Sequence, residues 1–246
     1  MAGNVYVDNI KQDKPGFLVS SKSKVEIRGK CNPYVSRGGL KLEKALQSFS
    51  VSLTGKTVLD IGASTGGFTD CALLHGAAKV IALDVGYGQL DWKLRNHPDV
   101  VIMERFNVRY LNEKHLPFKP QVATVDVSFI SLKLVLPVLF SLEFEQIIAL
   151  VKPQFEASPD RVGKRGVVRD LNIHKEILEK VVDISVEHNY IAQNLTYSPI
   201  KGPQGNIEYF IYLEKPKNKA SDTVHQEPKS CLSVENVVQE AHRKLY

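Results

Sequence analysis

Three aspartates and one lysine stand at or near the ends of short apolar runs: Asp60, Asp84, Asp126 and Lys152. Apolar runs of this length predict buried strands. Because the carboxyl ends of parallel strands meet at one edge of a sheet, we expect these four side chains to gather there. A lysine beside an aspartate is costly to bury, so the group is either a structural ion pair or a site that carries chemistry.

Residues 57–68, Thr-Val-Leu-Asp-Ile-Gly-Ala-Ser-Thr-Gly-Gly-Phe, predict a buried strand, a tight glycine turn and the start of a helix. Ser64 occupies the position of the middle glycine in a dinucleotide fingerprint, and no Gly-Lys-Ser/Thr follows, which weighs against NAD, FAD and a phosphate loop. An Asp-x-Gly strand end before a loop of small residues suits a ligand with an amino acid and a nucleoside but no phosphate. S-adenosylmethionine is such a ligand; the alternative is a plain strand, turn and helix.

The predicted cofactor site draws on several strand ends. Asp84 ends the second predicted strand, where an acid can accept hydrogen bonds from both hydroxyls of a ribose; a helix cap is its alternative role. Residues 104–107 follow a third strand, 100–103, at the same edge. We predict that the following residues contact the cofactor: Asp60, Gly62, Ala63, Ser64, Thr65, Gly66, Gly67, Phe68, Asp84, Asn107 and Asp126.

Composition limits the class of protein. The 246 residues are 43% hydrophobic, which suits one main domain with appendages, and the net charge of +5 indicates an anionic partner only where the charge is clustered. The three cysteines show neither a disulfide framework nor metal-site spacing, so we expect a cytoplasmic protein without a metal. We find no signal peptide, and the most apolar segment, 132–142, is too short to span a bilayer, so we expect no membrane contact.

Strands and helices are predicted to alternate from residue 42 onward. An amphipathic helix covers 42–49, and further helices are predicted at 68–74, 86–95, 129–142 and 173–188, with a polar loop at 154–170. The last two strands, 191–197 and 209–213, are joined by a segment too short for a crossover helix, so they must pair antiparallel. The predicted fold class is α/β: a class I S-adenosylmethionine-dependent methyltransferase (Rossmann-like) with a seven-stranded, mostly parallel sheet and an antiparallel terminal hairpin.

The two ends of the chain differ from this core. Residues 1–30 hold short strand-like pieces and many lysines, which indicates either a solvated arm or part of an RNA-binding module. The predicted division is a partial module at 1–30, a linker at 31–39, a methyltransferase domain at 40–216 and a polar tail at 217–246. We expect the tail to be dispensable and partly disordered, with a terminal helix from residue 234.

The residues after the fourth and fifth strands narrow the choice of methyl acceptor. Amino-group methyltransferases commonly carry Asn/Asp-Pro-Pro-aromatic there, whereas this chain has Asp126-Val-Ser-Phe129. Cytosine C5 chemistry needs a cysteine nucleophile, and the sequence has none in that region. A ribose hydroxyl needs a base to remove its proton, and a buried lysine is able to do this. Lys152 is the best-placed candidate.

Six ordered motifs resemble those of the TlyA group, the bacterial "hemolysin A" family of FtsJ-related rRNA 2′-O-methyltransferases. They lie at residues 34–42 (Tyr-Val-Ser-Arg-Gly-Gly-Leu-Lys-Leu), 60–71, 84–90, 126–132, 151–156 (Val-Lys-Pro-Gln-Phe-Glu) and 198–208. The resemblance spans about residues 31–214. Residues 2–16 are similar to the second half of the α-L RNA-binding module of this family, so we expect a truncated module.

The resemblance implies a catalytic tetrad of Lys41, Asp126, Lys152 and Glu208, with S-adenosylmethionine as the cofactor. Lys152 would assist deprotonation of the 2′-hydroxyl, Asp126 would orient Lys152, and Lys41 and Glu208 would position the ribose. The implied substrates are cytidines of small- or large-subunit ribosomal RNA, in the RNA or in ribosomal subunits. Two alternatives stay open, a membrane-active hemolysin and an RNA-binding module without turnover. We expect RNA contacts from Arg37, Lys44, Arg161, Lys164, Arg165, Arg169 and Lys201.

Overall fold

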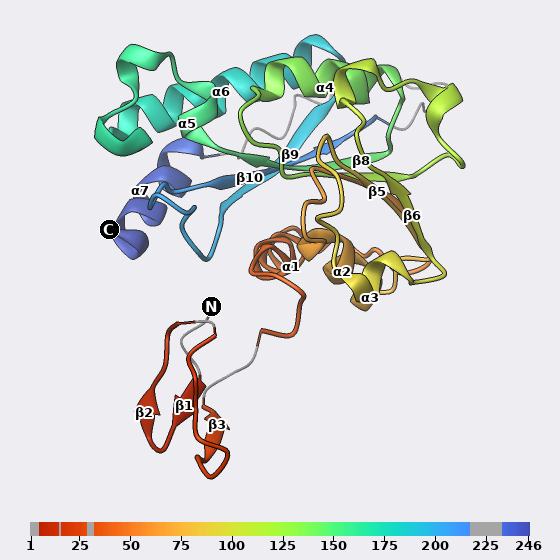
Figure 1. Ribbon diagram of the computed structural model, residues 1–246. Helices are drawn as coiled ribbons and strands as arrows, with labels where there is room; N and C mark the ends of the chain where they lie inside the picture. Colours follow the sequence, from red (N-terminus) through yellow and green to blue (C-terminus); the bar gives the residue numbers. More distant parts are fainter. Residues whose placement is uncertain (1–4, 15, 29–31, 217–232) are drawn as a thin grey trace. The chain divides into compact units, whose positions relative to one another are not determined.

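The computed structural model describes residues 5–14, 16–28, 32–216 and 233–246 (Figure 1). The chain divides into two compact units, Met1–Pro33 and Tyr34–Tyr246. This division falls inside the predicted linker, 31–39. Residue 31 of that linker and residues 217–232 of the predicted polar tail lie outside the described residues.

The N-terminal unit contains a small antiparallel sheet with the strand order β2-β1-β3. Its strands are β1 (Val5–Val7), β2 (Ile10–Lys11) and β3 (Val25–Ile27). Asp8 and Asn9, both with positive φ, form the tight turn between β1 and β2. Among the described residues of this unit, Val7 is the one apolar residue that is buried, so the unit has almost no core of its own.

The large unit is built on a seven-stranded sheet with the order β6-β5-β4-β7-β8-β10-β9. The pairs from β6 to β8 are parallel, and β10 lies antiparallel between β8 and β9. This arrangement confirms the predicted sheet and its antiparallel terminal hairpin. The strands are β4 (Thr57–Ile61), β5 (Lys79–Leu83), β6 (Val100–Met103), β7 (Val122–Val125), β8 (Gln146–Val151), β9 (Ile191–Tyr197) and β10 (Tyr209–Glu214).

Helices cover both faces of the sheet, so the central strands are buried on both sides. Figure 1 shows α1 to α3 on one face and α4 and α6 on the other. Successive side chains of β8 therefore point to opposite faces of the sheet and into different apolar cores: Ile147 belongs to one core and Ile148 to the other. The helices are α1 (Gly38–Phe49), α2 (Gly67–Leu74), α3 (Trp92–Arg95), α4 (Leu132–Ser141), α5 (Pro153–Glu156), α6 (Leu171–Glu187) and α7 (Val234–Leu245).

Several predicted helices begin at other residues in the structure. The helix predicted at 86–95 is confined to α3, because Asp91 caps its N-terminus and Gly88 has a positive φ. The helix predicted from residue 129 begins at Leu132, since Phe129 has a φ of 63° and the Ser131 hydroxyl accepts the N–H of Lys133. The predicted polar loop at 154–170 contains α5 and two short 3₁₀ turns.

The predicted terminal helix forms as α7, and it packs against α6 and β9. Val238 and Ala241 of α7 are buried in the same core as Leu178 of α6. This end of the chain therefore contributes to the core of the large unit, which argues against the expectation that the tail is dispensable. Among the described residues, no helix is both long and apolar enough to cross a bilayer.

Candidate active site

The turn after β4 brings the backbones of two strands together. Gly62 has a φ of +83°, and the N–H groups of Gly62 and Ala63 both donate to the Leu83 carbonyl, at 2.8 and 3.1 Å. A Cβ at Gly62 would lie 2.4 Å from the backbone oxygen of Asp126. Only glycine satisfies both conditions. This contact sets the Gly62 turn directly against the segment that carries Asp126.

Asp60 lies beneath this turn and lines neither of the two cavities that open beside it. Its side chain is fully buried and accepts hydrogen bonds from the hydroxyls of Thr69, at 2.6 Å, and Thr124, at 3.1 Å. Burial raises the pKa of the Asp60 carboxyl to about 7. The prediction that Asp60 contacts the cofactor therefore needs correction, because its oxygens are turned inward to tie β4, β7 and α2 together.

A cavity of about 640 Å³ opens at the carboxyl ends of β4, β5 and β7. Its polar lining includes Ser64, Asp84, Asn107 and Asp126, and its apolar walls include Phe106. Asp84 is held by two backbone N–H groups, that of Ser64 at 2.8 Å and that of Gly86 at 2.6 Å. An oriented carboxylate above an apolar slot suits a nucleoside, so these residues fit the predicted cofactor.

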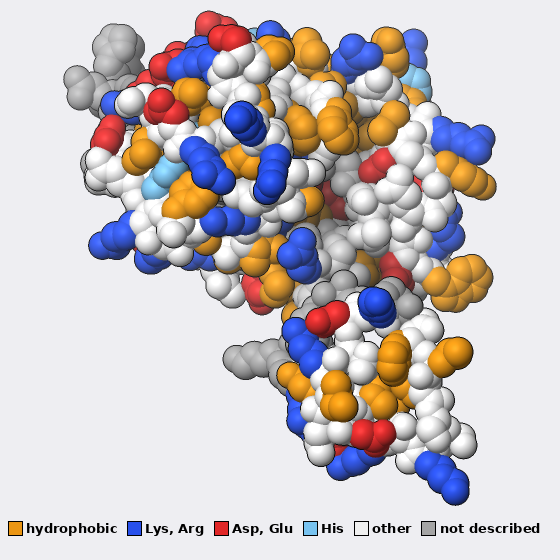
Figure 2. Space-filling view, turned by 60° about the vertical axis from the view of Figure 1, so that its left-hand side comes forward, with side chains coloured by type: hydrophobic (Ala, Val, Ile, Leu, Met, Phe, Trp, Pro, Cys, Tyr) orange, Lys and Arg blue, Asp and Glu red, His pale blue; other side chains and the backbone are white. Residues whose placement is uncertain are grey.

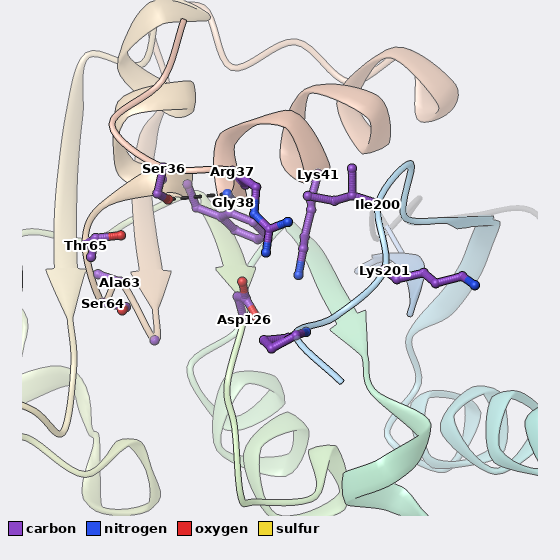
Figure 3. A pocket seen from close by; sticks show the side chains of 14 residues that line it. Ser36, Arg37, Gly38, Lys41, Ala63, Ser64, Thr65, Asp126, Ile200 and Lys201 are labelled. Carbon is purple, nitrogen blue, oxygen red and sulfur yellow. Dashed lines mark hydrogen bonds between the residues drawn. The ribbon is translucent and has the colours of Figure 1, made fainter. Parts of the chain in front are cut away.

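A second cavity, of about 240 Å³, adjoins the first and shares Gly62, Ser64 and Asp126 with it. Ala63, Thr65, Gly67 and Phe68 line it from the turn, Ser36, Arg37, Gly38 and Lys41 line it from α1 and the residues before it, and Ile200, Lys201 and Pro203 line it from the segment before β10. Figure 3 shows Arg37 and Lys41 extending into this cavity above Asp126, while the Lys201 side chain points away from it.

Two residues that were predicted to contact the cofactor, Asp60 and Gly66, line neither cavity. The φ of Gly66 is +96°, and a Cβ there would lie 2.2 Å from Cδ1 of Leu94. The missing side chain leaves room for the helix α3 to pack against the turn. Gly66 therefore serves the packing of the turn rather than the lining of the cavity.

Asp126, which lines both cavities, is paired with the amine of Lys152, which itself lines neither. Lys152 Nζ lies 2.6 Å from Asp126 Oδ1 and donates a hydrogen bond of 2.9 Å to Ser128 Oγ. Lys152 follows β8 and precedes the short helix α5, whereas Asp126 follows β7. The Lys152 side chain is 9% exposed, so the pair is largely removed from water.

A second buried pair lies on the other side of the sheet edge. Lys41 Nζ of α1 lies 2.5 Å from Oε2 of Glu208, which precedes β10. The side chains are 11% and 1% exposed. Gly202 makes room for this carboxylate, because a Cβ at residue 202 would lie 2.6 Å from Glu208 Oε1. All four residues of the predicted tetrad therefore occur in oppositely charged pairs, in which Lys41, Lys152 and Glu208 are buried and Asp126 is partly buried.

The residues predicted to bind RNA have different surroundings. Lys164, Arg165 and Arg169 are exposed, whereas Lys44 is partly buried on α1. Arg161 forms two hydrogen bonds with Glu176, at 2.6 and 3.1 Å, so its charge is already partnered. Figure 2 shows Lys and Arg side chains gathered on one face of the large unit, beside a hollow in its surface.

Several polar residues of the cavity linings were not singled out from the sequence, among them Ser36 and Ser128. Ser36 lines the second cavity, and its Oγ accepts the N–H of Gly38 at 3.3 Å. Ser128 lines the first cavity and accepts a hydrogen bond from Lys152. A serine in a loop has no distinguishing pattern, so only its place between motif residues could have drawn attention to it.

This arrangement combines the requirements for methyl transfer to a hydroxyl group. One cavity suits a nucleoside-containing cofactor, and the adjoining one places amines and carboxylates over its end. A buried amine paired with a carboxylate is able to accept a proton from a hydroxyl held beside it. Asp126 lines both cavities.

Comparisons with known proteins agree with this geometry. The chain is 47% identical to "Putative rRNA methyltransferase YqxC" of Bacillus subtilis, over all of this chain and 87% of that protein. It is 40% identical to the 16S/23S rRNA (cytidine-2′-O)-methyltransferase TlyA of Mycobacterium tuberculosis, over 92% of this chain and 87% of that one. The solved structure "Putative hemolysin from Streptococcus thermophilus" superposes with a TM-score of 0.82 and 43% identity, covering 99% of this chain and 88% of that one.

The match to a family model covers most of the large unit. The model of the FtsJ-like methyltransferases matches residues 34–215, which include both cavities and all four tetrad residues. The resemblance of the sequence motifs to the TlyA group is thereby confirmed, as is the methyltransferase fold. The chain belongs to the FtsJ-like methyltransferase family.

Proposed function

We propose that this protein transfers a methyl group from S-adenosylmethionine to a ribose 2′-hydroxyl of ribosomal RNA, at a cytidine. The observation that carries the proposal is that Asp126, which lines both the cofactor cavity and the second cavity, is paired with the amine of Lys152. The named TlyA relative supports the choice of a cytidine in ribosomal RNA. Such a substrate implies that the protein acts in the cytoplasm.

The cofactor would occupy the larger cavity. Asp84 would accept hydrogen bonds from the ribose hydroxyls, and Asn107 and Phe106 would border the base. The turn at residues 62–65 would carry the amino-acid part toward the second cavity, which the same residues line. When bound, the cofactor supplies an electrophilic methyl group on a sulfonium. Asp60 and Gly66 would support this site from beneath and contact no part of the cofactor.

The proton of the 2′-hydroxyl would pass to Lys152. A hydroxyl oxygen is a weak nucleophile until its proton is removed, and the Lys152 amine is paired with Asp126 of the cavity lining and hydrogen-bonded to Ser128 of the same lining. Asp126 would hold that amine in place. Lys41 and Glu208 would fix the ribose on the opposite side, and the alignment of oxygen with methyl carbon would supply much of the rate.

The RNA would approach over the second cavity. Arg37 and Lys201 line it, and Lys41 extends into it, so phosphates of the strand would meet positive charge there (Figure 3). Lys164, Arg165 and Arg169 would extend this contact along the exposed segment after α5. Arg161 and Lys44 would contribute less, since the former is paired and the latter partly buried. Phosphate contacts of this kind make affinity depend on salt.

The decisive experiment is transfer of labelled methyl groups from the cofactor to unmodified ribosomal subunits and to the naked RNA, followed by mapping of the modified positions. We expect label at a ribose 2′-oxygen of a cytidine. Label on a base, or no transfer to either RNA form while the cofactor binds, would overturn the proposal. The second of these outcomes is the one expected of an RNA-binding module without turnover.

A further inference from the structure

Ser128 is a polar residue of the site to which neither the sequence motifs nor the tetrad gives a role. It lies two positions after Asp126, in the segment between β7 and α4, and it lines the cofactor cavity. Its Oγ accepts the hydrogen bond that Lys152 Nζ donates, at 2.9 Å. One short segment thus offers the amine two acceptors, a carboxylate and a hydroxyl.

The two contacts of the Lys152 amine differ in kind. The 2.6 Å contact with Asp126 Oδ1 is an ion pair, and within the described residues Oδ1 accepts no hydrogen bond of proper angle. Coulomb attraction sets the distance between two charges but does little to fix the rotation of a terminal amine. The contact with Ser128 has hydrogen-bond geometry, which depends on direction. Ser128 therefore orients the group that Asp126 attracts.

The geometry of the amine then determines where a substrate is able to meet it. A lysine nitrogen is tetrahedral, with one bond to Cε and three remaining directions. The hydrogen bond to Ser128 uses one of these directions, and the Asp126 carboxylate lies beside the amine on the same segment, after β7. A direction that faces neither residue is left for the hydroxyl of a substrate.

From these contacts we propose that Ser128 is a positioning residue, which fixes the Lys152 amine so that its remaining direction faces the ribose 2′-oxygen. This inference rests on the proposed function. In the reaction, Lys152 first releases one proton of its ammonium form to water; the lone pair of the neutral amine then takes the hydroxyl proton, while Ser128 accepts a hydrogen bond from one of its N–H groups. The freed oxygen pair forms the bond to the methyl carbon, the carbon–sulfur bond breaks, and its electron pair stays on sulfur. The amine leaves the step as an ammonium.

An isosteric pair of variants distinguishes the effect of the Ser128 hydroxyl from the effect of side-chain volume. Ser128→Thr keeps the oxygen, and Ser128→Val has the shape of threonine without it; residue 128 is exposed, so either side chain has room. We expect Ser128→Val to lower kcat about tenfold, as for one lost hydrogen bond to a charged group. KM for RNA and Kd for the cofactor should stay within about twofold of wild type, and Ser128→Thr should recover most of the rate.

Two results of this series would overturn the inference. Equal kcat for the threonine and valine variants would mean that the hydroxyl plays no part. A rise in the cofactor Kd of Ser128→Val as large as its loss of kcat would mean that Ser128 contacts the cofactor instead of positioning Lys152.

A second measurement needs no RNA and thereby separates this inference from the proposed function. The rate at which an acylating reagent modifies Lys152 is followed by peptide mass spectrometry in the protein alone. We expect faster modification of Lys152 in Ser128→Val than in Ser128→Thr, because the amine is no longer held, with Lys133 as an internal control exposed in all variants. Equal rates would refute the inference even in an active enzyme. Different rates in a protein that fails to methylate RNA would refute only the proposed function.

Discussion

Lys41 and Glu208 are 167 positions apart in the chain, yet Nζ of the first lies 2.5 Å from Oε2 of the second. The pair joins α1 to the start of β10 and is buried on both sides. Burying two charges costs a large desolvation energy, which their attraction only partly offsets. A fold that keeps such a pair beside the second cavity, which Lys41 lines, rather than two apolar side chains, has a use for the charges.

We expect the coupling of this pair to appear in a double-mutant cycle. Lys41→Met or Glu208→Gln alone should lower the free energy of unfolding by about 3–5 kcal/mol, because each leaves a buried charge without its partner. The double variant should cost less than the sum of the two single variants. Urea unfolding measures all three. Additive costs would mean that the two charges do not interact. Transfer to RNA should be lost in every variant, which separates stability from activity.

Lys152 and Asp84 should separate catalysis from cofactor binding. We expect Lys152→Ala to lower the transfer rate at least about 100-fold, as for a lost general base, with the cofactor Kd nearly unchanged. Asp84→Ala should raise the cofactor Kd by about 10- to 100-fold, because it removes the acceptor for two ribose hydroxyls. Calorimetric titration and single-turnover transfer at saturating cofactor measure the two quantities. Equal losses of binding and rate in Lys152→Ala would mean that Lys152 is structural.

The positions of the central strands were predictable because parallel strands buried on both faces appear in the sequence as continuous apolar runs, whereas their order in the sheet was not predicted. Val122–Val125 is an example, since all four residues are buried. The short segment before β10 likewise predicted correctly that β10 pairs antiparallel with β9. Helix starts were less predictable. Those of α3 and α4 depend on caps at Asp91 and Ser131 and on the backbone angle of Phe129, which periodicity does not reveal.

The candidate site was predictable only where the chemistry lies at a strand end. Asp84, Asp126 and Lys152 follow strands; the two aspartates line the cofactor cavity, and Lys152 is paired with Asp126. Residue type alone gave no reason to choose Lys41, because a lysine on an amphipathic helix is usually solvated; only the family motif indicated it. Asp60 shows the opposite failure. Its place in the glycine motif suggested a ligand contact, but Thr69 and Thr124 use its oxygens.

The buried Asn206 should control the shape of the basic segment 164–169. Its Oδ1 accepts the N–H of Val168 at 3.0 Å, and its Nδ2 donates to the Gly166 carbonyl at 2.8 Å. We expect Asn206→Ala to loosen this segment and raise KM for RNA several-fold, with the cofactor Kd unchanged. The segment contains Lys164, Arg165 and Arg169, so trypsin should cleave it faster in the variant. The exposed Asn194→Ala is the matched control. Unchanged cleavage and KM would contradict the prediction.

His174 is fully buried where α6 meets α7 and β10. Its Nε2 donates to the Val168 carbonyl at 3.0 Å, so in the neutral ring Nδ1 accepts from the Tyr209 hydroxyl at 2.7 Å and from His242 Nε2 at 3.1 Å. Burial, with a smaller contribution from the nearby His242, lowers the pKa of His174 to about 4, although the hydrogen bond to Val168 and the charge of Asp170 oppose the shift. Protonation would place a charge in an apolar core and replace an acceptor with a donor.

The sign of the resulting pH dependence follows from proton counting. Between about pH 6.5 and 4 the unfolded chain binds a proton at His174 that the folded chain does not, so the free energy of unfolding should fall as the pH falls, by up to about 3 kcal/mol. Asp60 acts in the opposite direction, because its raised pKa of about 7 makes the folded state bind more protons than the unfolded state below that pH. The informative quantity is therefore the difference in the free energy of unfolding between wild type and His174→Gln, measured by urea unfolding at several pH values. We expect the stability of wild type relative to this variant to decrease toward pH 4. A difference that does not change with pH would show that His174 does not titrate between the two states.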